Sequence, residues 1–177
     1  MARRDPLSDP EPLIRRVYSY VAYRIGPGAD AEDVTSTVIE RALRYRSSYD
    51  PGKGDPRAWL LGIARTCVDD HLKTRSDLPL EDANLSGSHS EEDSTIDRLG
   101  IAAVVSRLDD RDRELIALRY GADLASREIG DLLGMNAAAV DVALHRTRER
   151  LRTELEQSGY RTSAGQRVIR AAPEASA

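Results

Sequence analysis

The chain has 177 residues, of which 40% are hydrophobic and 32% charged, and its formal net charge is −4. This length fits one domain or two small ones, and seven Tyr, one Trp and no Phe predict modest helical cores. No apolar run approaches the roughly 18 residues that span a bilayer, and the first residues lack a signal peptide's apolar segment. We therefore expect a cytoplasmic protein without membrane insertion. The single cysteine, Cys67, excludes an internal disulfide and a cysteine-based zinc site.

Charge is distributed unevenly along the chain. Residues 1–75 hold 13 basic and 11 acidic side chains, whereas residues 76–100 hold one basic and seven acidic. Residues 101–156 hold nine and 11, and residues 157–177 hold three and one. Because neutralisation of phosphates supplies much of the affinity for DNA, this acidic balance argues against tight, independent DNA binding. A DNA-binding role would need help from another component.

Two amphipathic helices are predicted in the first 45 residues. The first follows about ten polar residues and ends at Gly26-Pro27-Gly28. The second is expected to run from Ala31 to about Tyr45, with Asp30 as its N-cap. The apolar face of the first comprises Leu13, Val17, Tyr20, Val21, Arg24 and Ile25, with Arg15 and Arg16 outside it; in the second, Val34, Val38 and Leu43 are expected to face inward.

A turn-rich loop over residues 47–56 precedes a third predicted helix, Arg57–Arg75. Asp69, Asp70 and His71 could be read as metal ligands. Adjacent residues point to different sides of a helix, however, so we expect no metal site there. The packed face of this helix is expected to contain Trp59, Leu60, Ile63, Cys67 and Leu72.

Residues 76–96 divide the chain, because they are polar, acidic and poor in branched apolar residues, which predicts a flexible linker. Two further helices are expected over Ile96–Leu108 and Arg111–Tyr120. The tail, residues 157–177, has lost amphipathic regularity, and we expect it to be disordered. The prediction is an all-α chain with small helical domains over residues 10–75 and 97–156.

The segment Leu124–Arg152 predicts a helix-turn-helix. Ser126 is expected to cap the first helix, Gly134 to end it in a left-handed conformation, and Asn136 to cap the second. Gly130 should let the two helices approach closely. An ordinary helical hairpin would show the same helical spacing of apolar residues and is the alternative. A helix-turn-helix places its second helix in the major groove of DNA. The second helix would pack through Val140, Leu144, Thr147 and Leu151, and its opposite face carries Ala138, Val142, His145 and Glu149, with Asp141, Arg146 and Arg152 at the edges.

The sequence LDDRDRELIALRYGADLASREIGDLLGMNAAAVDVALHRTRERL resembles the C-terminal domain of bacterial extracytoplasmic-function sigma factors. The match rests on Leu108–Tyr120, on Glu128-Ile129-Gly130 and on Leu144-His145-Arg146 followed by Arg148. In that family this domain reads the minus-thirty-five promoter element. The resemblance implies that the residues at this element are Ser126, Arg127, Asn136, Ala138, Asp141, Val142, His145, Arg146 and Arg148.

The segment DAEDVTSTVIERAL, residues 30–43, resembles the helix with which these sigma factors dock on the clamp helices of RNA polymerase. Asp30, Ala31, Glu32, Asp33, Arg41 and Ala42 stand as the family has them, although Ser36 occupies a position where Gln is expected. A charged helix face that is merely solvated is the alternative. The polymerase-binding residues implied by the resemblance are Asp30, Glu32, Asp33, Ser36, Glu40, Arg41 and Arg44.

The segment RAWLLGIARTCVDDHLKTR, residues 57–75, resembles the family pattern RAWLxxIARNxxxDHLR. In the family, this helix and the loop before it form a pocket for a base flipped out of the minus-ten element. An aromatic ring that stacks on a base and a cation that holds a phosphate are the usual pair for single-stranded DNA, although the loop could also be a plain connector. The resemblance implies that this site comprises Tyr49, Lys53, Arg57, Trp59, Arg65 and Lys73.

Together these motifs predict a sigma factor that binds core RNA polymerase and directs promoter-specific transcription initiation, with an anti-sigma factor as a further candidate partner. The family's linker threads the active-site cleft of the polymerase, whereas the plain alternative is a spacer. The chain lacks a phosphate-binding glycine loop and a nucleophile with its base, so we expect no enzymatic activity and no cofactor or metal. The rivals are a stand-alone helix-turn-helix regulator, and a nuclease or phosphotransferase that uses Asp69, Asp70 and His71.

Overall fold

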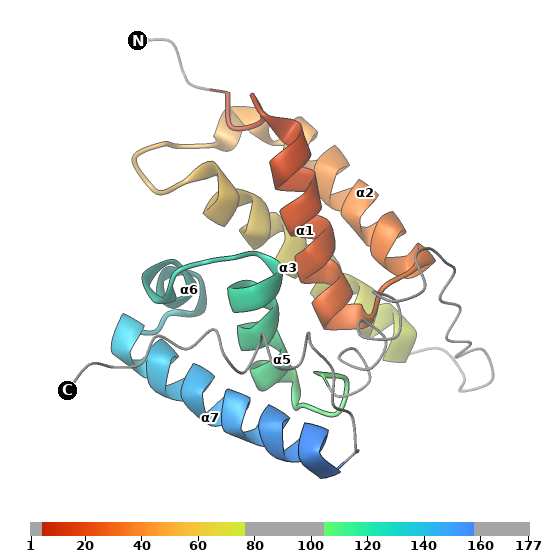
Figure 1. Ribbon diagram of the computed structural model, residues 1–177. Coiled ribbons are helices and arrows are strands. Elements are labelled where there is room, and N and C mark those ends of the chain that lie inside the picture. The colour runs from red at the N-terminus through yellow and green to blue at the C-terminus, as the bar shows by residue number, and fades with distance from the viewer. Residues whose placement is uncertain (1–4, 77–104, 158–177) are drawn as a thin grey trace.

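The computed structural model describes residues 5–76 and 105–157, and every regular element in these ranges is a helix (Figure 1). The predicted all-α class is confirmed. The expected linker beyond Ser76, most of the expected Ile96–Leu108 helix and the tail beyond Gln157 lie outside the described residues. The elements are α1 (Pro10–Ile25), α2 (Ala29–Arg44), η1 (Arg46–Ser48), α3 (Pro56–Ser76), α5 (Asp110–Ile116), η3 (Ala117–Gly121), α6 (Ser126–Leu133) and α7 (Ala137–Gln157).

The N-terminal half is a bundle of α1, α2 and α3 around an apolar core (Figure 1). The predicted apolar face of α1 packs on this core: Tyr20 and Val21 are fully inaccessible, whereas Leu13 and Ile25 at its ends are partly buried. Gly26, with φ +92°, ends α1 and donates its N–H to the carbonyl of Ala22. The core residues of the three helices are Val17, Tyr20, Val21, Ala31, Val34, Val38, Ala42, Leu60, Leu61, Ala64, Cys67 and Val68.

Two expectations for the second helix are wrong. This helix begins at Ala29, and Gly28, with φ +128°, precedes it without a side-chain cap. Asp30 therefore lies inside the first turn, where its carboxylate pairs with Arg75 at 3.0 Å. Leu43 is 57% exposed, because the helix period places its neighbour Ala42 against the core instead.

The C-terminal half consists of α5, one π-helical turn (η3) and the two helices of the predicted helix-turn-helix. Gly134 ends α6 with φ +67°, and the Asn136 side chain accepts a 2.7 Å hydrogen bond from the N–H of Ala139. Both expectations are confirmed. The expected cap at Ser126 is wrong, because Ala125 is the N-cap and Ser126 is already the first helical residue. The packed face of α7 is as predicted: Val140, Leu144, Thr147 and Leu151 are all buried.

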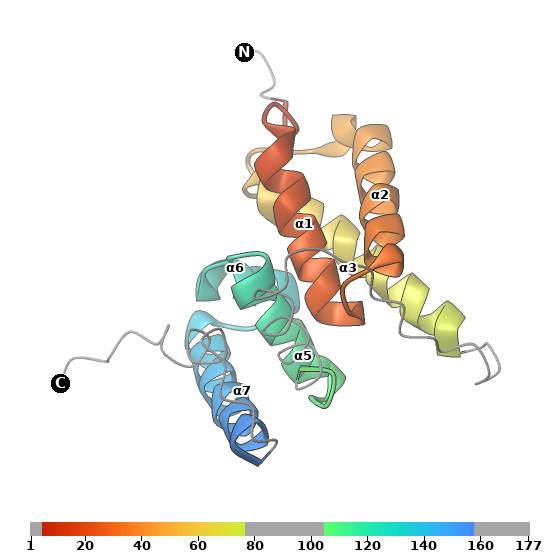
Figure 2. The same cartoon turned by 45° about the vertical axis from the view of Figure 1, so that its right-hand side comes forward.

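The two halves share one apolar core. A single cluster of buried residues runs from α1, α2 and α3 into α5, η3, α6 and α7, and it includes Leu115 and Leu118 beside Tyr20. A smaller cluster around Ile116 and Leu151 also receives Tyr23 from α1. Figures 1 and 2 show α5 lying between α1 and α7, so that α7 forms the outer edge of the molecule. No helix within the described ranges is long and apolar enough to span a membrane.

The close packing inside the helix-turn-helix depends on Gly130. A Cβ at this position would lie 2.5 Å from the carbonyl oxygen of Met135 in the turn, so the turn would have to shift. We predict that Gly130→Ala lowers the free energy of unfolding by about 1–3 kcal/mol, as overpacking does. The measurement is urea denaturation followed by circular dichroism.

Gly62→Ala is the matched control for this change. Gly62 lies inside α3, and a Cβ there would meet nothing within 4 Å. Because Ala is favoured over Gly in a helix interior by roughly 0.5–1 kcal/mol, this variant should be as stable as the parent or slightly more stable. Equal destabilisation of both variants would show that Gly130 has no special packing role.

Candidate polymerase-binding and nucleic-acid-binding surfaces

The exposed face of α2 is acidic. Glu32, Asp33 and Glu40 are exposed along it, while Val34 and Val38 hold the opposite face against the core. Within the described residues, the carboxylates of these three acids form no ion pair with a basic side chain. Five of the seven predicted polymerase-binding residues are exposed on this helix: Asp30, Glu32, Asp33, Ser36 and Glu40.

The two predicted arginines of α2 differ in their surroundings. Arg44 is exposed, whereas Arg41 is partly buried, and its two terminal nitrogens each lie 3.2 Å from Oδ2 of Asp70 on α3. Arg41 therefore fixes α2 against α3. The exposed side chains of Leu43 and Tyr45, 57% and 52% accessible, extend this surface with apolar area.

Tyr49 does not project from the loop before α3. Its ring is buried, its hydroxyl donates to the carbonyl of Gly54 at 3.0 Å, and its centroid lies 5.6 Å from that of Trp59. Lys53 is exposed at the tip of the loop. The two aromatic rings proposed for a base pocket are thus together, but in this conformation Tyr49 contacts Trp59 and its own loop.

Two of the three predicted cations on α3 contact the C-terminal half. Arg65 donates from Nη1 to the carbonyl of Leu132 on α6 at 2.9 Å, and Arg57 lies 3.2 Å from the carboxylate of Glu128. Arg57 also bonds to Asp55, and this hydrogen bond raises the pKa of Arg57 further. Lys73 is exposed near the end of the helix.

The outward face of α7 carries most of the predicted minus-thirty-five residues. Val142 is 52% exposed, and the carboxylate of Asp141 accepts a hydrogen bond from the hydroxyl of Ser126 on α6. His145 and Arg146 are also exposed, so this face of α7 does not pack on the core. The structure places all nine predicted residues on α6, α7 or the turn between them: Ser126, Arg127, Asn136, Ala138, Asp141, Val142, His145, Arg146 and Arg148.

Asp69, Asp70 and His71 of α3, the alternative metal ligands, do not point to a shared site. Asp69 lies 3.8 Å from Arg24, Asp70 pairs with Arg41, and His71 lies 3.8 Å from Asp30. The three side chains therefore have three different partners. Across residues 5–76 and 105–157, no group of three or more His, Cys, Asp and Glu side chains could hold a metal ion.

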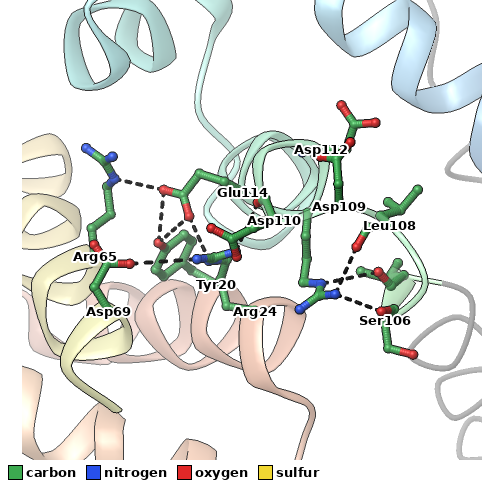
Figure 3. Close-up of polar contacts among 12 residues, drawn as sticks. Tyr20, Arg24, Arg65, Asp69, Ser106, Leu108, Asp109, Asp110, Asp112 and Glu114 are labelled. Atoms are coloured by element: carbon green, nitrogen blue, oxygen red, sulfur yellow. Dashed lines mark hydrogen bonds and ion pairs between the residues drawn. The ribbon is translucent and has the colours of Figure 1, made fainter. Parts of the chain in front are cut away.

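A buried polar cluster between the two halves was missed by sequence analysis (Figure 3). We call it the Glu114 cluster, and it consists of Tyr20, Arg24, Arg65 and Glu114. Glu114 on α5 accepts hydrogen bonds from the Tyr20 hydroxyl at 3.0 and 3.1 Å and from Nε of Arg65 at 2.8 Å. Its Oε2 lies 2.7 Å from Nε of Arg24.

Two groups of the Glu114 cluster, Arg24 and Tyr20, have raised pKa values. The Arg24 side chain is only 2% exposed, and it bonds to Asp110 at 2.7 Å. Burial opposes its charge, but Asp110 and Glu114 outweigh burial and raise the pKa of Arg24. Burial and the charge of Glu114 also raise the pKa of Tyr20 far above its ordinary value, so its hydroxyl remains a donor. The one signal in the sequence was an arginine on an otherwise apolar helix face, which requires an acidic partner.

The comparisons with known proteins identify both halves. Residues 11–77 match the family model for sigma-70 region 2, and residues 98–151 match the model for sigma-70 region 4. The chain belongs to the extracytoplasmic-function sigma factors. The predicted family is therefore confirmed, and it is favoured over the alternative of a stand-alone helix-turn-helix regulator.

Relatives of this sigma factor include BldN of Streptomyces coelicolor, which is 37% identical over 140 residues. That match covers 73% of this chain and 52% of BldN, so the chain spans about half the length of this relative. SigL of Mycobacterium tuberculosis is 26% identical over 149 residues, covering 81% of this chain and 84% of SigL.

Two solved structures share the fold of this sigma factor. RpoE from Bartonella quintana, crystallised with the anti-sigma factor NepR, has a TM-score of 0.66 at 16% identity. The match covers 81% of this chain and 92% of RpoE. CnrH in complex with the cytosolic domain of CnrY has a TM-score of 0.59 at 22% identity, covering 82% and 81%.

The geometry around Trp59 generates a prediction for the base pocket. Trp59 is the only tryptophan, so the intrinsic fluorescence of this sigma factor reports on the Tyr49–Trp59 pair. If the pair forms a base pocket, a base that stacks on it will quench this fluorescence, so we predict quenching by a single-stranded oligonucleotide. Replacing both Tyr49 and Lys53 by Ala should weaken binding by at least about tenfold, since stacking is worth about 1–3 kcal/mol per base.

The control for this titration is Tyr45→Ala, which removes an exposed tyrosine outside the predicted pocket. Its titration curve should match that of the parent. A fluorescence signal that does not respond to the oligonucleotide at any concentration would leave the loop as a connector.

Proposed function

We propose that this chain binds core RNA polymerase through α2 and directs it to promoters through α3 and the helix-turn-helix. The observation that carries the proposal is the presence of two separate exposed surfaces in one molecule. Helices α2 and α7 lie at opposite edges of the molecule (Figure 2), and the exposed acids of α2 and the exposed side chains of α7 are therefore on separate halves. A protein that binds RNA polymerase and promoter DNA at the same time needs both surfaces.

The proposed division of labour follows the two halves. Residues 10–75 would dock on the polymerase clamp and recognise and melt the minus-ten element, and residues 97–156 would read the minus-thirty-five element. The exposed Lys53 suits a phosphate contact, and Arg146 suits a bidentate pair with guanine. Asp141 is suited to accept from a cytosine amino group, and Ala138 and Val142 to contact a thymine methyl.

Two further properties belong to this proposal. An anti-sigma factor is a candidate partner, because RpoE was solved in complex with the anti-sigma factor NepR. The sigma factor would act inside the cell, in the cytoplasm, where the polymerase is. It would contribute binding and positioning without catalysis of its own, since the polymerase carries the chemistry.

The acidic face of α2 generates the first test. We predict that Asp33→Arg, or Glu40→Arg if the contact lies further along the helix, weakens association with core polymerase more than about tenfold, because opposed charges at a contact cost a few kcal/mol. Both side chains are exposed, so helical content should be unchanged. The measurement is co-purification with core polymerase, together with circular dichroism.

Glu11→Arg is the matched control, because Glu11 is an exposed acid on α1 whose partner is Arg15 in the next turn. It should leave association unchanged. If Asp33→Arg and Glu40→Arg both co-purify with polymerase as the parent does, the docking assignment is wrong.

The outward face of α7 generates the second test. In holoenzyme bound to a promoter selected from a library, Arg146→Ala should cost roughly 1–3 kcal/mol and relax the preference at one base position. Arg15→Ala is the control, because Arg15 is an exposed arginine on α1 that pairs with Glu11 and lies outside the predicted DNA-binding residues. Uniform weakening on all sequences, with a smaller salt dependence, would instead identify Arg146 as a phosphate contact.

A further inference from the structure

A buried polar contact joins α5 to the second helix of the helix-turn-helix. The Oγ1 hydroxyl of Thr147 on α7 donates to Oδ1 of Asp112 on α5 at 2.8 Å. Thr147 is fully buried, and Asp112 is 8% exposed. Arg150, three residues further along α7, pairs with the other oxygen of the same carboxylate. Figure 3 shows Asp112 leaving α5 on the side away from Glu114, so this contact is separate from the Glu114 cluster.

Asp112 is itself fixed by the start of its own helix. Asp109 is the N-cap of α5, and its side chain accepts a 2.8 Å hydrogen bond from the N–H of Asp112. The carboxylate of Asp109 also lies 3.4 Å from Arg150. The first turn of α5 therefore presents two carboxylates to α7, and one of them is buried. A buried carboxylate without partners is unfavourable, so the position of α7 is tied to Asp112 through Thr147 and Arg150.

The apolar contacts of α7 do not fix its rotation as closely. Val140, Leu144 and Leu151 pack on the core, but the burial of apolar surface is non-directional. A hydrogen bond, in contrast, weakens steeply when its distance or angle changes. The bond from Thr147 to Asp112 therefore distinguishes one rotation of α7 about its axis from neighbouring rotations that bury the same apolar side chains.

Thr147 lies opposite the face of α7 that the proposed function assigns to the promoter. Successive residues of an α-helix are about 100° apart around its axis. His145 is therefore about 200° from Thr147, and Ala138 is about 180° from it. A rotation of α7 by about 10° moves a group that is about 5–6 Å from the axis by about 1 Å. Such a shift is enough to break a hydrogen bond between a side chain and a base.

We propose that Asp112 is a positioning residue for promoter readout: through Thr147 and Arg150 it sets the rotation of α7, and thereby the side chains that face the bases. The inference rests on the proposed function in assigning the outward face of α7 to DNA. Asp112 does not reach the bases, because it is buried on the opposite side of this helix. A buried polar contact of this kind selects one arrangement of two helices more than it adds net stability.

Two variants of the full chain remove the contact and should leave α7 folded. Thr147→Val replaces the hydroxyl by a methyl group of similar size. Asp112→Ala removes the acceptor without leaving a buried group of α7 unpaired. The Thr147 hydroxyl also lies 3.0 Å from the carbonyl oxygen of Ala143 in its own helix, and the Arg150 side chain is 56% exposed to water. Thr147→Ser, which keeps the hydroxyl, is the conservative variant.

The measurement is the base preference of the holoenzyme in the minus-thirty-five element. It is the ratio of the affinities for a promoter that the parent holoenzyme selects from a library and for single-base variants of that promoter. A smaller folded fraction lowers all of these affinities alike and leaves the ratio unchanged, whereas a rotated α7 changes it. Because a bidentate pair gives a preference of about 5- to 150-fold, Thr147→Val and Asp112→Ala should each reduce the preference at the position that Arg146 reads by at least about fivefold.

The controls separate the contact from other effects of the substitutions. Thr147→Ser should keep the preference of the parent. Thr153→Val is the matched control, because Thr153 is exposed on α7 and its hydroxyl donates to the carbonyl of Glu149 in the same helix. It should leave the ratio unchanged. Since both changes act through one contact, the double variant Asp112→Ala with Thr147→Val should lose no more preference than either single variant.

An unchanged ratio in folded Thr147→Val and Asp112→Ala would overturn the positioning role, and so would additive losses in the double variant. Circular dichroism establishes helical content, and if Asp112→Ala loses helix, Thr147→Val decides. Loss of helix in both single variants would show that the contact holds the fold rather than the rotation of α7, which also overturns the proposal. A wrong functional assignment shows instead in the parent, whose holoenzyme would then have no base preference in the minus-thirty-five element.

Discussion

The burial of Arg24 is the constraint on which the arrangement of this molecule depends. A guanidinium on the apolar face of α1 requires carboxylates, and the N-terminal helices offer only Asp69 at 3.8 Å. The near partners, Asp110 and Glu114 at 2.7 Å, belong to α5. The charge of one half is therefore satisfied by the other, and the apolar core continues across the same boundary. This is why two family regions that are separate in sequence form one body here.

The same contact relates structure to function. Glu114 and Glu128 of the C-terminal half pair with Arg65 and Arg57 of α3, two of the residues that the sequence predicts for the minus-ten element. The acidic face of α2 is not involved in the contact and stays exposed.

The helices of the helix-turn-helix pack closely, but the outward face of the second helix carries an acidic side chain that disfavours contact with DNA. Asp141 lies on the outward face of α7, and its hydrogen bond from Ser126 places a carboxylate beside the start of α6. A helix N-terminus favours such a charge, but an anionic DNA backbone does not. Among Ala138, Asp141, Val142, His145 and Arg146 on the outward face of α7, Arg146 is the one side chain suited to a bidentate base contact, so we expect the affinity of this half alone to be small. Tethering through polymerase would supply the remainder as effective concentration.

Sequence by itself determined what depends on neighbours within a few residues: the helices, the left-handed Gly134, the Asn136 cap and the packed face of α7. It placed the caps at Asp30 and Ser126 wrongly, because Gly28 and Ala125 begin those helices without a side-chain cap, and it placed Leu43 inward although Ala42 takes the core position. Only the tertiary structure decided that Tyr49 packs on Trp59 and that Glu114 meets Tyr20, 94 residues away. Periodicity reports which face of a helix is buried, but it carries no information about which distant helix covers that face.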